Sequence, residues 1–174
     1  CGGAHHWARR LQALGHHVEL LPPHKVREHV TGNKDDAADA RGIWIAAHQQ
    51  DIRRVPVKTA QQQAELAVHR LRSHCVAMRT ASVNALRSLL YEVGVTLPQG
   101  RFSGLRCIGE HRADIDAMLP PLMFRLVDRQ LQVLHELDVH VKALEAEIQE
   151  IQRTNPTAQR LAKVPGIGPL GATA

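Results

Sequence analysis

The chain has 174 residues, of which 44% are hydrophobic and 3% are aromatic, and its formal net charge at pH 7 is +5. So few aromatic side chains disfavour a β-sandwich and favour helices packed through narrow seams. No apolar run approaches the roughly 20 residues that span a bilayer, so we expect no membrane contact. The three cysteines lack metal-site spacing and predict reduced thiols in a cytoplasmic protein.

The N-terminal region predicts a small α/β remnant. A Gly2-Gly3 turn leads into a helix whose expected buried stripe is Trp7, Leu11 and Leu14,. A short strand should follow over residues 17–21, where apolar side chains partly alternate before two prolines. A short helix would then span residues 24–30.

The acidic stretch that follows predicts the start of another helix. Asn33 or Asp35 can cap it, and either choice places Asp36 and Asp39 in the first turns on one face,. Adjacent carboxylates repel each other unless a cation lies between them, and Mg²⁺ or Mn²⁺ accepts such oxygen pairs. The helix dipole also favours these carboxylates without any metal, so the spacing alone leaves both interpretations open.

A long basic helix is expected from about residue 59 to residue 93. Four arginines lie outside its expected heptad seam and are predicted to contact nucleic-acid phosphates: Arg70, Arg72, Arg79 and Arg87,. The alternative is a solvated basic face. The seam itself comprises Ala64, Val68, Leu71, Cys75, Met78, Ser82, Ala85 and Leu89,.

The next segment, residues 94–121, contains several glycines and prolines and predicts a linker. A second long helix is expected from about residue 122 to residue 152. Its seam must pack on the first long helix or across a dimer. The seam comprises Val127, Leu134, Leu137, Val141, Leu144, Ile148 and Ile151,.

The C-terminal residues predict a short helix followed by a hairpin. Asn155-Pro156 has the form of an N-cap followed by proline at the first helical position,. In the following turn, Gly166 and Gly168 would let backbone N–H groups approach a DNA phosphate without reading bases. The alternative is a plain turn between helices.

Several motifs in this chain resemble, in order, those of bacterial insertion-sequence transposases with a RuvC-like domain and an Asp-Glu-Asp-Asp signature, the bridge-RNA-guided recombinases. The resemblance extends over nearly the whole chain. The motifs are Cys1-Gly2-Gly3-Ala4-His5-His6-Trp7-Ala8-Arg9, Asn33-Lys34-Asp35-Asp36-Ala37-Ala38-Asp39-Ala40, Val55-Pro56-Val57-Lys58-Thr59 with Gln62 and Gln63, and Val164-Pro165-Gly166-Ile167-Gly168-Pro169.

This resemblance implies a DNA strand-cleaving and rejoining enzyme that uses Mg²⁺ or Mn²⁺ held by Asp36 and Asp39. Asp35 would only start the helix. The resemblance further implies a structured guide RNA, a homo-oligomer formed through coiled-coil helices, two acidic residues upstream of Cys1 and a nucleophilic serine downstream of the hairpin. The chain would then be an internal fragment without a complete active site.

The resemblance also implies a fold and a division of the chain. The expected fold is mainly α, with a truncated RuvC-like (RNase H-like) domain, long coiled-coil helices and the start of a helix-hairpin-helix element. The competing interpretations are a non-catalytic nucleic-acid-binding or oligomerisation module from a decayed element, and a helical scaffold. The expected parts are the RuvC-like remnant 1–56, the basic helix 57–93, the linker 94–121, the coiled-coil helix 122–153 and the C-terminal domain start 154–174.

Overall fold

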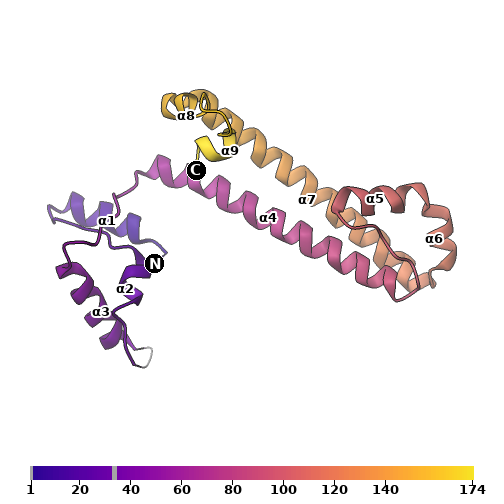
Figure 1. The fold of residues 1–174 in the computed structure, drawn as a ribbon, viewed down its shortest axis with the longest axis horizontal. Helices are drawn as coiled ribbons and strands as arrows, with labels where there is room; N and C mark the ends of the chain where they lie inside the picture. Colours follow the sequence, from indigo (N-terminus) through magenta and orange to yellow (C-terminus); the bar gives the residue numbers. More distant parts are fainter. Residues whose placement is uncertain (1, 33–34) are drawn as a thin grey trace. The chain divides into compact units, whose positions relative to one another are not determined.

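Helices make up most of the chain, as Figure 1 shows. The computed structural model describes residues 2–32 and 35–174. The chain divides into two units, Cys1–Ala64 and Glu65–Ala174. The prediction of a mainly α fold is therefore confirmed for the described residues, while its RuvC-like and helix-hairpin-helix details stay predictions.

The first unit contains three short helices, α1 (Ala4–Ala13), α2 (Pro23–Arg27) and α3 (Asp36–His48). The prediction of a strand over residues 17–21 was wrong. Within the described residues, this segment forms only an isolated antiparallel bridge between Leu20 and Val55, in which the Val55 amide donates to the Leu20 carbonyl at 2.8 Å. One bridge gives a strand too few cross-strand partners to persist as a sheet.

The expected buried stripe of α1 was also wrong, because Trp7 is 64% exposed and Leu14 is 73% exposed. The buried residue of this helix is Ala8. In α3, the residues that become buried are Gly42 and Ala46. A Cβ atom at Gly42 would lie 2.6 Å from the Val30 side chain, so a glycine is required where the residues after α2 press against α3,.

Arg54 ties the first unit together at the carboxyl end of α3. Its Nη2 donates to the Ala47 carbonyl at 2.6 Å, and its Nε donates to the Glu19 carboxylate at 2.7 Å. These bonds satisfy a carbonyl that the helix leaves unpaired at its end. The charge-assisted hydrogen bond from Arg54 also lowers the pKa of Glu19.

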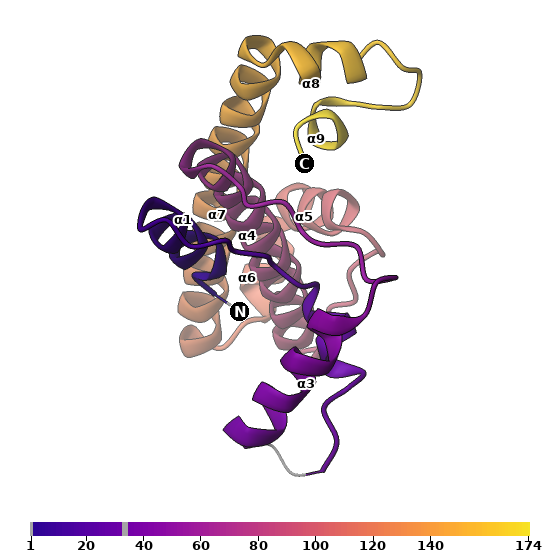
Figure 2. The ribbon, with the colours of Figure 1, turned by 90° about the vertical axis from the view of Figure 1, so that its left-hand side faces the viewer.

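In the second unit, two long antiparallel helices lie side by side, α4 (Ala60–Tyr91) and α7 (Pro121–Thr154) (Figures 1 and 2). Their polar contacts pair earlier residues of α4 with later residues of α7, as expected for antiparallel helices. Arg72 bonds to Glu145 and Arg79 bonds to Asp138. The α7 seam is confirmed at five of its seven expected residues, which are buried, while Leu144 and Ile151 are half-buried. These buried residues are Val127, Leu134, Leu137, Val141 and Ile148.

The expected seam of α4 was wrong by one residue. Its buried residues are Val83, Leu86 and Leu90, whereas Leu71, an expected seam residue, is 55% exposed. The observed face buries branched side chains where the expected face offered Ser82 and Ala85. Packing through the observed face buries more apolar surface than packing through the expected face would. It also places Arg72 and Arg79 next to α7, where they form ion pairs.

The prediction that residues 94–121 form a linker was wrong about their secondary structure. The structure has two helices there, α5 (Arg101–Glu110) and α6 (Arg112–Met118). Ile108, Ile115 and Leu119 from this segment are buried in the same core cluster as the α4 and α7 residues. Burial of these three apolar side chains supplies the free energy that orders a glycine-containing segment.

The chain ends in two short helices, α8 (Pro156–Leu161) and α9 (Pro169–Ala172). The predicted N-cap is confirmed, because the Asn155 side chain accepts hydrogen bonds from the Thr157 and Ala158 amides. Figure 2 shows the extended turn that joins the two helices. Among the described residues, no helix is long and apolar enough to span a membrane.

Candidate metal site and nucleic-acid interface

The two candidate metal ligands lie in the first turn of α3. Asp36 and Asp39 are both exposed. The Asp35 carboxylate caps the helix by accepting a hydrogen bond from the Ala38 amide at 2.7 Å. The predicted helix start is therefore confirmed at Asp35. The alternative cap Asn33, together with the neighbouring Lys34, lies outside the described residues.

The arrangement offers two carboxylates and no complete coordination shell. Within residues 2–32 and 35–174, no group of three or more His, Cys, Asp or Glu side chains could hold a metal ion. Oxygen donors one helical turn apart suit Mg²⁺, which commonly takes one or two protein carboxylates and completes its octahedron with water or phosphate. The donor chemistry of Asp36 and Asp39 therefore fits part of a divalent-ion site, and metal binding there stays a prediction.

The four candidate arginines of α4 fall into three different settings. Arg70 is exposed and has no carboxylate partner in the part of the chain that the structure describes. Arg72 and Arg79 form ion pairs with α7 at 2.6 Å and 2.9 Å. Arg87 donates to the backbone carbonyls of Pro98 and Gly100. The expectation that all four lie outside the seam was therefore wrong for Arg72 and Arg79.

The predicted glycine hairpin lies between α8 and α9. Gly166 has a φ of +87°, which only glycine adopts without strain, while Gly168 is extended at φ −84° and ψ 179°,. Both residues are exposed, and no other atom lies within 4 Å of the position of a Cβ on either. The backbone at the turn is therefore open to a ligand, and phosphate contact there stays a prediction.

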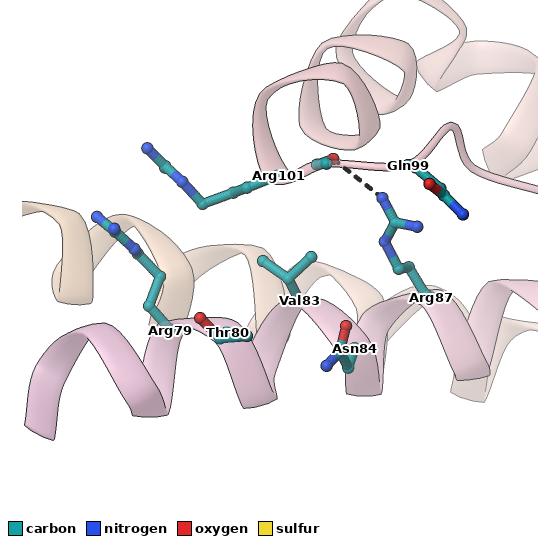
Figure 3. A pocket seen from close by; sticks show the side chains of 8 residues that line it. Arg79, Thr80, Val83, Asn84, Arg87, Gln99 and Arg101 are labelled. Atoms are coloured by element: carbon teal, nitrogen blue, oxygen red, sulfur yellow. Dashed lines mark hydrogen bonds between the residues drawn. The ribbon is translucent and has the colours of Figure 1, made fainter.

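A pocket of about 400 Å³ lies between α4 and the start of α5 (Figure 3). Arg79 and Arg87 from α4 and Arg101 from α5 line it. Arg101 was not among the predicted site residues, because residues 94–121 were interpreted as a linker. The only local signal is that Arg101 precedes Phe102, an exposed aromatic residue in a chain with few aromatic side chains.

The chain is similar along its length to proteins named as transposases. The chain is 42% identical to a probable family 20 transposase of Pseudomonas aeruginosa, with 100% of the chain and 52% of that relative covered. It is 35% identical to the transposase of insertion sequence element IS1328 from Yersinia enterocolitica, over 99% of the chain and 51% of that relative. It is 33% identical to the transposase of IS1111A from Coxiella burnetii, over 99% of the chain and 47% of that relative.

The chain is homologous to insertion-sequence transposases. It spans about half the length of the curated relatives that it matches. No family model and no solved structure matches the chain.

Proposed function

We propose that this chain is part of an insertion-sequence transposase that cuts and rejoins DNA strands with Mg²⁺ or Mn²⁺. The observation that carries the proposal is similarity along 99–100% of the chain to proteins named as transposases. The arginine-rich second unit and the net charge of +5 support DNA as the polyanionic partner,.

In this proposal, Asp36 and Asp39 hold the divalent ion. The ion polarises a phosphoryl oxygen and stabilises the charge that develops during strand transfer. The two aspartates project from the start of a helix, and Asp35 and Arg54 hold the two ends of that helix. The remaining ligands of a RuvC-like Asp-Glu-Asp-Asp set and a nucleophilic serine would come from residues outside these 174.

The proposal extends to the partners of the complete enzyme. A structured guide RNA selects DNA sites, and the enzyme works as a homo-oligomer in the cytoplasm. In the structure, Val127 and Leu134 of the α7 seam lie in one core cluster with residues of α4 from the same chain. An oligomer would therefore use other faces of the long helices, such as the one that carries the exposed Leu71 and Met78.

The experiment is a strand-transfer assay on the complete gene product that contains these residues, with new DNA junctions detected by amplification. We expect Asp36→Asn and Asp39→Asn each to reduce junction formation at least about 100-fold, because even partners that only orient metal ligands are worth about 10–100-fold. Asp35→Asn is the matched control, since it removes the same charge while asparagine still caps the helix,.

Wild-type junction formation by both Asp36→Asn and Asp39→Asn would contradict the metal assignment. The second candidate function is a non-catalytic nucleic-acid-binding module. The incomplete carboxylate set among the described residues favours it. This candidate predicts that the unmodified protein binds nucleic acid but makes no junctions at any Mg²⁺ or Mn²⁺ concentration.

A further inference from the structure

The arginine pocket beside α4 has an excess of positive charge. Its guanidinium groups come from Arg79, Arg87 and Arg101, and none of its lining residues is acidic. Asp138 is shared, since Arg79 donates to it at 2.9 Å and Arg101 at 2.7 Å. One carboxylate therefore serves two guanidinium groups, and the partners of Arg87 within the described residues are backbone carbonyls. Such a site favours an anion, and phosphate oxygens match the geometry of guanidinium donors.

The pocket is held in place before any ligand binds. The Arg87 guanidinium donates to the Pro98 carbonyl and, at 2.9 Å, to the Gly100 carbonyl. Figure 3 draws the bond to Gly100. A Cβ atom at Gly104 would lie 3.1 Å from Arg87 Nη2, so glycine in α5 leaves room for this side chain. Because Arg87 and Arg101 are already ordered, a phosphate would bind without a large loss of side-chain entropy.

Exposed aromatic rings lie beside two of the pocket's arginines. The Arg101 guanidinium lies 4.1 Å from the centre of the Phe102 ring, and Phe102 is still 77% exposed. Tyr91 is 69% exposed and lines a second pocket together with Arg87. Arg87 therefore connects the two pockets. Positive charge combined with exposed rings is typical of surfaces that bind unpaired nucleotides, whose bases stack on the rings.

We propose that Phe102, the arginine pocket and Tyr91 together bind a single-stranded segment of nucleic acid. A backbone phosphate occupies the pocket, and the neighbouring bases stack on the two rings. This inference rests on the proposed function as a nucleic-acid enzyme and adds the class of ligand. Paired bases are stacked inside a duplex and cannot reach the rings, so the surface should prefer single strands.

The test is fluorescence anisotropy with the 174-residue chain, a labelled single-stranded RNA, a single-stranded DNA of the same sequence and the matched DNA duplex. We expect Phe102→Ala and Tyr91→Ala each to weaken single-strand binding about 5- to 100-fold and to leave duplex binding within about 2-fold, the range expected for loss of one stacked base. We expect Arg87→Gln to weaken binding of both forms, because it removes a phosphate contact.

Two control variants separate the surface from general effects. Trp44→Ala removes an exposed ring from α3, and Arg106→Gln removes an exposed charge from α5 outside the pocket. Both should leave the preference for single strands unchanged. Because Phe102 and Tyr91 are exposed, their alanine variants should keep the helical circular dichroism signal of the parent chain.

Ring-dependent binding of either the RNA or the DNA single strand would support the inference. If Phe102→Ala and Tyr91→Ala bind both single strands as tightly as Trp44→Ala does, the inference is overturned, whatever the strand-transfer assay shows. If the rings matter for single-strand binding but the complete gene product makes no junctions, the inference holds and the proposed transposase activity fails.

Discussion

Replacement of Leu86 by alanine should lower the free energy of unfolding by about 2–5 kcal/mol. Leu86 is 1% exposed and packs in the core cluster with residues of α5, α6 and α7. Truncation removes its transfer free energy and leaves a cavity between helices that cannot close fully. Urea denaturation followed by circular dichroism measures the change, because most of the helical signal comes from the second unit,.

Leu71→Ala is the matched control for this experiment. Both substitutions replace leucine with alanine in the same helix, so their effects on helix propensity are equal,. Leu71 is exposed, and we expect its variant to remain within about 0.5 kcal/mol of the parent,. The heptad seam inferred from the sequence predicts the reverse order. A larger loss for Leu71→Ala than for Leu86→Ala would therefore contradict the packing described above.

Replacement of Asp138 by asparagine should have two effects of opposite sign. Asp138 accepts hydrogen bonds from Arg79 and Arg101, and all three side chains are partly buried, with 18–27% of their surface exposed. Loss of its charge leaves two guanidinium groups together without a counter-ion. We expect a destabilisation of about 1–3 kcal/mol, between the values for exposed and buried ion pairs. The same change frees positive charge in the pocket, so affinity for single-stranded nucleic acid should rise.

Glu150→Gln is the control for Asp138→Asn. It also neutralises one carboxylate on α7, but its ion pair with Arg153 is exposed. We expect little change in stability and only a small, non-specific gain in affinity. Denaturation and anisotropy measurements on both variants give the comparison. Equal behaviour of the two variants would show that Asp138 does not organise the pocket.

Local features of the fold were predictable because their causes lie within a few residues. The caps are Asp35 and Asn155. In each, a side-chain oxygen accepts hydrogen bonds from backbone amides two or three residues later,. The α7 seam was predictable because Val127, Leu134, Val141 and Ile148 recur seven residues apart without a competing stripe,.

The seam of α4 could not be predicted from its own residues. Two adjacent stripes on this helix carry apolar side chains, one including Leu71 and Met78 and the other including Val83 and Leu86. The carboxylates Glu145 and Asp138 on α7 make the second stripe acceptable by pairing with its arginines. This choice depends on carboxylates that lie 73 and 59 residues away in the sequence, which local periodicity does not include.

The arginine pocket was partly hidden for a related reason. Arg79 and Arg87 were candidates for phosphate contact, but Arg101 joins them only because α5 packs beside α4. The glycines at 104 and 109 masked the helical pattern of Ile108, Ile115 and Leu119. In the structure, Gly104 has a specific role, since it makes room for Arg87.

Metal binding by Asp36 and Asp39 can be seen in a crystal structure of the complete gene product soaked in Mn²⁺, whose anomalous scattering locates the ion. We expect an ion about 2.1 Å from a carboxylate oxygen of Asp36 and of Asp39. A structure in which both side chains point into solvent, with Mn²⁺ bound elsewhere or absent, would contradict the metal assignment.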